Sequence, residues 1–459
     1  MKTLVRELPF YRETSDIFGL FAEAPLSVFL DSSLKNEMGR YSIIGLNPWL
    51  TVTEEDQICR CGGVPQRESF EKIMADCLRK HREENPTHLP LISGAVGYFS
   101  YDYGRKFEKI SSRHDKDIQI PDALFVFYDN YIIEDKKEKK LWLTACGKLK
   151  DARKSAEELT LQIQNCPKAS LPAKHCELAD FLPNFQKEEY KQAIDQMISY
   201  ITEGDIYIAN MTQQLKVSSP VAPYDAFRYL RTYNPSPFGA YFNGEDFQIV
   251  CSSPERFLRV KDGWVETRPI KGTRKRGSSP AEDAALRTEL ENSGKDRSEL
   301  LMVVDLERND LNHVCEPGSV KVTEHFAVEA YATVFHLVST IVGKLRADMG
   351  IMDLIRAAFP GGSITGTPKI RAMEIIDQLE HSRRSLYTGS IGYLAFDGSC
   401  DLNIVIRTAL HTDGNYHLGV GGGITCESDL EFEYEETLQK ARAVLEALYP
   451  QKGDAHDED

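Results

Sequence analysis

The chain has 459 residues, a length that suggests two or three domains, or one unusually large one. Hydrophobic residues make up 41% of the sequence and charged residues 27%, which is typical of a globular protein with a sizeable core. The formal net charge of −15 argues against a sequence-independent nucleic-acid-binding protein, because such a protein needs a net basic face.

The cysteines and the apolar runs indicate where the protein works. The ten cysteines are scattered, without the CxxC or Cys/His spacing of a zinc site. The N-terminal stretch lacks the apolar core of a signal peptide, and no run of about 18 apolar residues could span a membrane. We therefore expect a reduced, cytoplasmic protein with free thiols and no membrane anchor.

The sequence texture divides the chain into zones. Residues 1–150 contain short apolar runs separated by turns, which predict β-strands. Residues 151–184 contain a polar amphipathic helix and then a loose stretch rich in Pro, Ala and Ser, so we expect a linker here. Residues 185–450 carry most of the motifs, and residues 451–459 form an acidic tail that we expect to be disordered.

Two helices are predicted in the third zone. Residues 187–203 have apolar side chains at helical spacing and are followed by Gly204, a residue favoured just after a helix. Residues 295–310 ("KDRSELLMVVDLERND") also have a helical pattern, and Pro368 stands in a position suited to the first turn of a further helix.

The end of the third zone predicts a small sheet and a helix. Three apolar runs are separated by "DG" dipeptides at 397–398 and 413–414, which are typical of hairpin turns, so we predict a three-stranded antiparallel meander. Ser428 is expected to cap the last helix, with Glu431 completing a capping box. The predicted class is α+β with large antiparallel sheets, rather than a succession of βαβ units.

Residues 268–277 ("RPIKGTRKRG") concentrate positive charge against the acidic trend of the chain and place Lys271 among four further cations. The segment is either a basic surface turn or a site for an anion. Neighbouring cations lower the pKa of an amine and so prepare a nucleophilic lysine. Glu255, beside a proline, is either a surface turn residue or, in a closed cleft, a general acid.

Charged residues also follow a glycine run near the end of the chain. Glu433, Glu436 and Lys440 project from one helical face, which is either a solvated stripe or part of a site. The helix emerges from Gly421–Gly423, whose bare N–H groups can approach an anion. With Glu299 from the 295–310 helix, the two glutamates would make an all-oxygen site suited to Mg²⁺.

Residues 359–376 ("FPGGSITGTPKIRAMEII") form a glycine-rich turn before a helix. The turn is either a tight loop with a helix cap or an anion cradle that uses Ser363, Thr365 and free N–H groups. Neither GxxxxGK[ST] nor a GxGxxG that follows a strand occurs here, so a P-loop and a dinucleotide site are excluded.

Together these motifs resemble the chorismate-utilising enzymes, and among them component I of aminodeoxychorismate synthase (the large subunit of para-aminobenzoate synthase). The resemblance covers nearly the whole chain and is strongest over residues 205–447, through long motifs such as "DRSELLMVVDLERND" and "GGGITCESDLEFEYEET". It implies an intertwined α/β body with two large antiparallel sheets in a sandwich flanked by helices, and an active site in a cleft.

The resemblance also implies the substrate and the ligands. The substrate would be chorismate, a dianion, aminated at C4 to 4-amino-4-deoxychorismate in 4-aminobenzoate and folate biosynthesis. Glu299 and Glu436, supported by Glu433, resemble the Mg²⁺ ligands, and Arg407 and Tyr393 resemble the clamp on the enolpyruvyl carboxylate. The remaining substrate contacts implied are Lys440, Gly421, Gly422, Gly423, His336 and Thr365.

Lys271 receives a specific role from the resemblance. Anthranilate synthases have alanine at this position, whereas aminodeoxychorismate synthases carry a lysine that attacks C2 as the 4-hydroxyl leaves, helped by a glutamate that matches Glu255. Ammonia then attacks C4 and expels the lysine, so Lys271 would decide the regiochemistry. Ile208 matches the lysine base of water-adding relatives and cannot deprotonate water, but amine-using relatives more often have glutamine there.

Further expectations concern regulation and partners. The N-terminal zone resembles the family's tryptophan pocket, and an ordinary buried strand-turn is the alternative. The implied pocket residues are Ser32, Arg40, Tyr41, Pro237 and Phe238. No glutaminase nucleophile is visible, so ammonia is expected from a glutamine amidotransferase subunit or from solution. The rival functions are anthranilate synthase component I and a non-catalytic paralogue.

Overall fold

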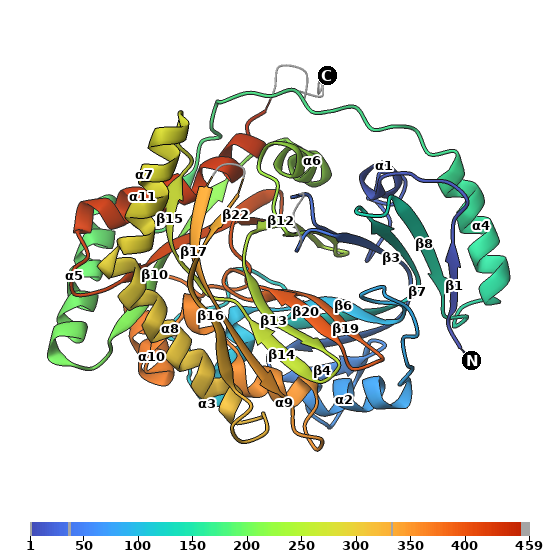
Figure 1. The fold of residues 1–459 in the computed structure, drawn as a ribbon, viewed down its shortest axis with the longest axis horizontal. Helices are drawn as coiled ribbons and strands as arrows, with labels where there is room; N and C mark the ends of the chain where they lie inside the picture. The colour runs from blue at the N-terminus through green and yellow to red at the C-terminus, as the bar shows by residue number, and fades with distance from the viewer. Residues whose placement is uncertain (1, 35–37, 332–333, 451–459) are drawn as a thin grey trace.

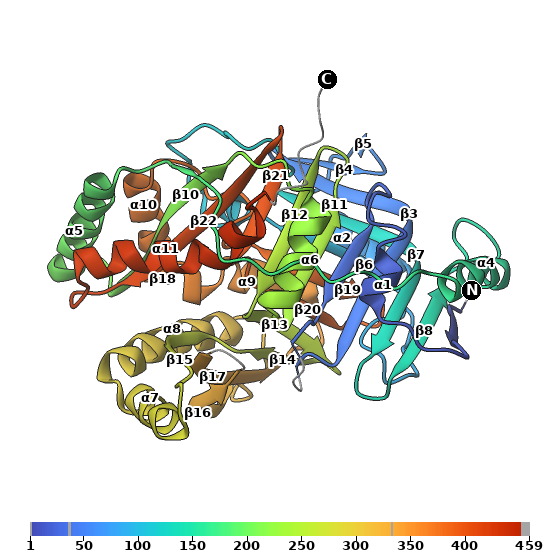
Figure 2. The same ribbon diagram turned by 90° about the horizontal axis from the view of Figure 1, so that it is seen from above.

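A computed structural model describes residues 2–34, 38–331 and 334–450, which Figures 1 and 2 show from two directions. The predicted acidic tail lies outside the described residues. Within the described ranges, no helix is both long and apolar enough to cross a membrane.

The strands of the described residues have the following bounds: β1 (Leu4–Glu7), β2 (Val28–Asp31), β3 (Tyr41–Glu55), β4 (Ile58–Cys61), β5 (Val64–Pro65), β6 (Gly94–Phe99), β7 (Ala123–Asp135), β8 (Lys140–Ala145), β9 (Leu182–Pro183), β10 (Ile208–Val217), β11 (Phe238–Asn243), β12 (Phe247–Ser253), β13 (Arg256–Lys261), β14 (Trp264–Thr267), β15 (Ile270–Lys275), β16 (Lys321–Ala330), β17 (Val334–Lys344), β18 (Gly366–Thr367), β19 (Ser390–Ala395), β20 (Cys400–Asn403), β21 (Thr408–Thr412) and β22 (Asn415–Ile424). The helices are α1 (Thr14–Phe18), α2 (Phe70–Lys80), α3 (Arg105–Glu108), α4 (Ala152–Gln164), α5 (Lys187–Glu203), α6 (Pro223–Tyr233), α7 (Pro280–Asn292), α8 (Gly294–Asn312), α9 (Ile351–Ala358), α10 (Lys369–Leu379) and α11 (Leu430–Ala447), with 3₁₀ turns at η1 (Tyr101–Gly104) and η2 (Gly362–Ile364).

Strands β3 and β7 join the two halves of the sheet. They pair with each other from Tyr41 opposite Asp135 to Glu54 opposite Ala123. The first arm of the sheet runs from β3 through β2, β11, β12, β21 and β22 to β10. The second arm runs from β7 through β6, β19, β20, β13, β14 and β17 to β15. Figure 1 shows the two arms facing each other, with β3 and β7 on the right where they meet.

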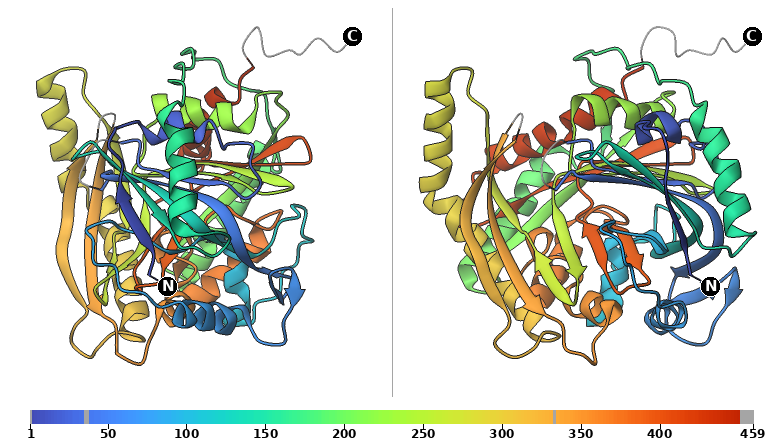
Figure 3. Two further views of the ribbon diagram at one scale, coloured as in Figure 1. Left: turned by 90° about the vertical axis from the view of Figure 1, so that its right-hand side faces the viewer. Right: turned by 45° about the vertical axis from the view of Figure 1, so that its right-hand side comes forward.

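This architecture confirms the predicted α+β class with large antiparallel sheets. The two layers of the expected sandwich are arms of one connected, curled sheet, because β3 and β7 link them through continuous hydrogen-bonded pairs. Figure 3 shows the curl from the side and at an oblique angle.

The sequence of β7 explains its central place. All thirteen of its residues are buried. Phe125 and Phe127 pack into one hydrophobic cluster, whereas Leu124 and Val126 pack into another on the opposite face. A strand covered on both faces has a continuous apolar run rather than alternating apolar and polar residues.

The predicted zones share this sheet. Strands β2 and β6 from residues 1–150 pair with β11 and β19 from residues 185–450. Helix α4 forms as predicted, and residues 165–181 then run without helix or strand. The linker therefore divides the sequence without dividing the sheet.

The predicted meander near the C-terminus is wrong. The "DG" turns do form two hairpins, β19–β20 and β21–β22, but β20 pairs with β13 and β21 pairs with β12. The expected middle strand breaks over residues 404–407, and Arg407 adopts a left-handed φ of 51° there. The chain passes from one arm to the other at this break.

The predicted helices exist, with shifted caps. Gly204 ends α5 in the left-handed conformation, as expected. The cap of α11 is Asp429, which accepts from the N–H of Phe432, whereas the Ser428 hydroxyl donates to Glu433 at 2.7 Å. Pro368 is the N-cap of α10 rather than its first residue.

Candidate functional site

Two crossings between the arms place predicted site residues together. Pro254 and Glu255 connect β12 to β13, and residues 404–407 connect β20 to β21. The backbone N–H of Ile404 donates to the carbonyl of Glu255 at 3.0 Å, which holds the crossings side by side. The topology therefore brings Glu255 close to Arg407.

The side chain of Glu255 is suited to proton transfer. It is buried, and its Oε1 has no hydrogen-bond partner among the described residues. Burial raises the pKa of Glu255, while a hydrogen bond from Ser363 and the charges of Lys271 and Arg407 act in the opposite direction. A buried carboxyl group with a raised pKa is a candidate general acid.

Lys271 extends from β15 of the second arm toward β22 of the first. Its Nζ lies 3.0 Å from the position that a Cβ on Gly423 would occupy. Oε2 of Glu299 and Cδ1 of Ile208 lie 3.7 and 3.5 Å from the same position. The amine therefore lies over Gly423, a residue without a side chain, in the neighbourhood of the Glu299 carboxylate and the apolar side chain of Ile208.

The other cations of the 268–277 segment do not surround the amine. The arginines form these ion pairs: Arg268 with Glu329, Arg274 with Glu289 and Asp296, and Arg276 with Asp283. The charges that act on Lys271 include those of Glu255 and Glu299. The expected environment of clustered cations is therefore wrong, because each arginine is compensated by its own carboxylate.

A second group of charges lies over Gly422. A Cβ at this residue would stand 2.9 Å from Oε2 of Glu436 and 3.2 Å from Oε2 of Glu433. Lys440 donates to Glu436 at 2.6 Å and to the carbonyl of Gly421 at 3.0 Å. Figure 2 shows α11, which carries the charged residues, beside β22, and α8 beside β15 and β17.

The carboxylates of this region have the donor chemistry of a Mg²⁺ site. Burial raises the pKa of both Glu299 and Glu433, so a nearby cation would favour their charged forms. Lys440 and Lys295 now hold Glu436 and Glu433, at 2.6 and 3.6 Å. Consistent with these pairs, no three acidic, His or Cys side chains of the described residues form a group that could hold a metal ion. Carboxylate oxygens are the donors that a hard cation prefers, but Glu436 and Glu433 are paired with lysines and the carboxylates do not converge on one point.

Arg407 and His336 line one cavity, together with Leu34, Pro254 and Tyr331. Burial lowers the pKa of Arg407 while Glu255 opposes this change, and among the described residues the guanidinium has no ion pair. Burial and the charge of Arg407 lower the pKa of His336 to about 3, so the imidazole is neutral at pH 7. An unpaired, partly desolvated guanidinium is suited to binding a carboxylate.

The glycine-rich turn supports the site rather than forming an anion cradle with Thr365. The hydroxyl of Thr365 is fully buried and donates to the carbonyl of Gly361 at 2.8 Å. Its N–H donates to the carbonyl of Gly362 at 3.4 Å. Ser363 instead provides the hydrogen bond to Glu255. The Thr365 hydroxyl can still accept a hydrogen bond, so its contact with substrate stays a prediction.

Tyr393 does not line the same cavity as Arg407, and a second tyrosine of the same motif, Tyr387, lies against β22. Tyr393 lines a different cavity from Arg407. A Cβ on Gly419 would stand 2.1 Å from Cγ of Tyr387, so this ring covers β22 directly. Burial raises the pKa of Tyr387, and the charge of Glu436 acts in the same direction. The sequence motif "YTGSIGYL" contains both tyrosines, and spacing did not distinguish them.

The cavity that contains Tyr393 is the one predicted for tryptophan. It encloses about 570 Å³ of empty space, part of it open to solvent. The predicted residues that line it are Ser32, Tyr41, Pro237 and Phe238. Arg40 is different, because its guanidinium pairs with Asp135 at 2.6 Å and the residue is not among the lining residues.

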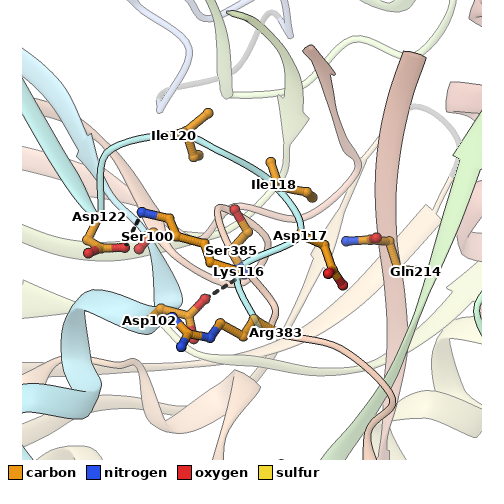
Figure 4. A pocket seen from close by; sticks show the side chains of 10 residues that line it. All are labelled: Ser100, Asp102, Lys116, Asp117, Ile118, Ile120, Asp122, Gln214, Arg383 and Ser385. Atoms are coloured by element: carbon orange, nitrogen blue, oxygen red, sulfur yellow. Dashed lines mark hydrogen bonds and ion pairs between the residues drawn. The ribbon is translucent and has the colours of Figure 1, made fainter. Parts of the chain in front are cut away.

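Figure 4 shows a further pocket, beneath residues 116–122, which contains none of the predicted site residues. Among its charged residues, Lys116 lies 3.3 Å from Asp122, and Asp102 pairs with Arg105, which lies outside the lining, at 2.6 Å.

Comparisons with known proteins agree with this fold. The chorismate binding enzyme family matches residues 30–446, and the chain belongs to this family. It is 42% identical over 361 residues to aminodeoxychorismate synthase component 1 of Klebsiella aerogenes, covering 79% of this chain and 78% of the relative. It is 38% identical over 459 residues to anthranilate synthase component 1 of Pseudomonas aeruginosa, covering 94% and 92%. The crystal structure of anthranilate synthase component I from Streptococcus pneumoniae TIGR4 superimposes with a TM-score of 0.81 at 30% identity, covering 90% of this chain and 93% of that one.

Proposed function

We propose that the protein aminates chorismate at C4 to give 4-amino-4-deoxychorismate, with Lys271 as a covalent nucleophile. The observation that carries this proposal is the position of the Lys271 amine over Gly423. There the amine interacts electrostatically with the carboxyl groups of Glu299 and Glu255. The relative from Klebsiella aerogenes supports the same activity. A basic surface lysine would have no reason to face two buried carboxyl groups.

The proposed reaction consists of two displacements. The Lys271 amine bonds to C2, the ring double bonds shift, and the C4–O bond breaks while Glu255 protonates the departing hydroxyl to water. Ammonia then bonds to C4, the double bonds shift back, and the C2–N bond to lysine breaks. The excess proton of the ammonium product returns to the Glu255 carboxylate, which restores both groups.

The other site residues would bind the two carboxylates of chorismate. Arg407 would hold one as a bidentate partner, because its guanidinium lacks an ion pair among the described residues. Glu299 and Glu436, with Glu433, would hold Mg²⁺, which would supply positive charge for the other carboxylate. Neutral His336 would contribute a hydrogen bond without adding charge.

Anthranilate synthesis is the second candidate, supported by the identity to the Pseudomonas aeruginosa relative. The deciding experiment incubates the purified protein with chorismate, Mg²⁺ and excess ammonium. An aminated chorismate that keeps its enolpyruvyl group supports C4 amination, with the mass spectrum as the measurement. Anthranilate with stoichiometric pyruvate would place nitrogen at C2 and leave Lys271 without the proposed role.

We also propose that a glutamine amidotransferase subunit supplies the ammonia and that the cavity containing Tyr393 binds L-tryptophan. The Klebsiella aerogenes relative is named component 1 of its synthase, which supports the existence of a second subunit. The cavity has the aromatic and polar lining that an indole amino acid requires. Calorimetric titration of L-tryptophan against wild-type protein and a Ser32→Trp variant tests the second proposal, since a filled cavity should abolish the binding heat.

A further inference from the structure

Glu307 is a buried carboxyl group in α8 that the proposed reaction does not use. Its Cγ lies 3.4 Å from the position that a Cβ on Gly362 would occupy. The next residue, Ser363, hydrogen-bonds Glu255. Glu307 and Glu255 therefore lie on either side of one short turn, and their charges interact directly.

The hydrogen bonds of Thr267 require a proton on Glu307. The hydroxyl oxygen of Thr267 lies 2.7 Å from the carbonyl oxygen of Phe257 and 2.9 Å from Oε2 of Glu307. A threonine hydroxyl has one hydrogen, and a backbone carbonyl can only accept. Both contacts become hydrogen bonds only when Thr267 donates to Phe257 and a protonated Glu307 donates to Thr267.

When the two carboxyl groups carry a single proton between them, the surrounding charges place it on Glu307 rather than on Glu255. Glu255 faces two cations, Lys271 and Arg407. Glu307 faces Glu255, Asp310 and one cation, Lys369, whose ammonium is bonded to Asp310 at 2.7 Å and to the carbonyl of Ala358 at 2.9 Å.

The pKa of Glu307 reflects these contacts. Burial, Glu255 and Asp310 raise it to about 8, while the hydrogen bond with Thr267 and the charge of Lys369 act in the opposite direction.

We propose that Glu307 is a positioning residue that keeps its proton throughout the reaction, so that Glu255 alone gives up a proton in the first displacement and carries the negative charge until the second. A charged Glu307 would repel that negative charge and so disfavour the loss of the proton from Glu255. The proposal rests on the proposed function only for the role of Glu255. The protonation of Glu307 itself does not depend on any reaction.

Infrared spectroscopy tests the protonation without substrate. Wild type and Glu307→Gln, both labelled with ¹³C in the glutamate side-chain carboxyl groups, are compared at pH 7. We expect the wild type to have a C=O band of a protonated carboxylic acid. The variant should lack this band, because glutamine has no carboxyl group, and it should keep the fold, because glutamine is neutral and has the same shape. A difference spectrum with carboxylate bands alone would overturn the proposal.

The pH dependence of chorismate amination tests the coupling to Glu255. The ratio of the Glu307→Gln rate to the wild-type rate should rise by about tenfold between pH 7 and pH 9. At one pH unit above its pKa, Glu307 of the wild type is about 90% ionised and the enzyme slows, whereas the glutamine of the variant stays neutral. A ratio that stays constant over this range would contradict the coupling.

Asp305→Asn, on the exposed side of α8, is the matched control and should change neither the band nor the ratio. Absence of aminated product at every pH would reject the proposed function and leave the infrared result standing.

Discussion

At the scale of single residues, the site depends on which charges are left without a simple partner. The arginines beside Lys271 in sequence are each paired with carboxylates, whereas Arg407 has no such pair among the described residues. Lys271 faces Glu255 and Glu299 instead. Chemistry at this site is therefore set by contacts between distant segments rather than by the local basic run.

Replacement of Lys271 by alanine should lower the rate of C4 amination by at least about a hundredfold, because no other amine is expected to bond to C2. The measurement is the rate of 4-amino-4-deoxychorismate formation by mass spectrometry. Lys275→Ala, which changes an exposed lysine of the same strand, is the matched control and should keep wild-type activity. Unchanged product formation in Lys271→Ala would show that the lysine is not the nucleophile.

At the scale of elements, β22 has glycines where other segments approach its two faces closely. Gly419 lies under the ring of Tyr387, Gly422 under the carboxylates of α11, and Gly423 under Lys271. Each glycine is needed for close approach rather than for an unusual φ, because none of the three has a positive φ.

Gly419→Ala should therefore destabilise the fold, because its Cβ would stand 2.1 Å from Cγ of Tyr387. Overpacking of a buried site costs about 1–3 kcal/mol or more, measured by urea unfolding. The control is Gly294→Ala at the start of α8, where a Cβ meets no atom within 4 Å. A loss in the control as large as that in Gly419→Ala would contradict the packing explanation.

Strand β2 is tied to its neighbours by a buried carboxylate. Asp31 lies 3.2 Å from Nζ of Lys136 and 3.0 Å from Nε of Arg231, and it accepts from the hydroxyl of Ser42 at 2.8 Å. Burial raises the pKa of Asp31, but these partners outweigh it and lower the pKa to about 2.

The stability contributed by Asp31 should be present above about pH 4 and lost as the pH falls toward 2, because the folded pKa lies below the unfolded one. The shift corresponds to about 2 kcal/mol. Urea unfolding from pH 6 to pH 3 should show a steeper acid loss in wild type than in Asp31→Asn. Parallel pH profiles would contradict this assignment.

At the scale of the whole molecule, the site lies where the two arms of the curled sheet come together again, away from β3 and β7. Strand β22 belongs to the arm that starts at β3, and β15 and β17 belong to the arm that starts at β7. A ligand that touches both arms should therefore stabilise the complete fold rather than one layer.

Chorismate together with Mg²⁺ should raise the melting temperature, with a stabilisation of about 2.7 kcal/mol at a ligand concentration of 100 times Kd. Addition of EDTA should reduce the effect, because the carboxylates over Gly422 would then repel the substrate. Glu436→Gln should lose the Mg²⁺-dependent part, whereas Glu435→Gln, on the exposed side of α11, should keep it. An equal shift in both variants would exclude Glu436 as a metal ligand.

The sequence by itself determined several features of this protein. Helical periodicity and Gly204 predicted α5, the "DG" dipeptides predicted two hairpins, and the long motifs predicted the family. These signals are local, because turn chemistry, capping and amphipathic spacing act within a few residues. The same motifs supplied Lys271, Glu255 and Glu299 as site candidates.

The tertiary structure alone decided how these segments combine. The expected meander became two hairpins in different arms, and the break between them gave Arg407 its place beside Glu255. Tyr393 was assigned to the wrong cavity, because a strand pattern does not tell which neighbour covers each face. The neutral state of Glu307 follows from Thr267 of β14, whose single hydroxyl hydrogen goes to the carbonyl of Phe257, so that the Thr267 oxygen accepts from Glu307. Long-range pairing and burial fix such contacts, and neither is encoded in the spacing of nearby residues.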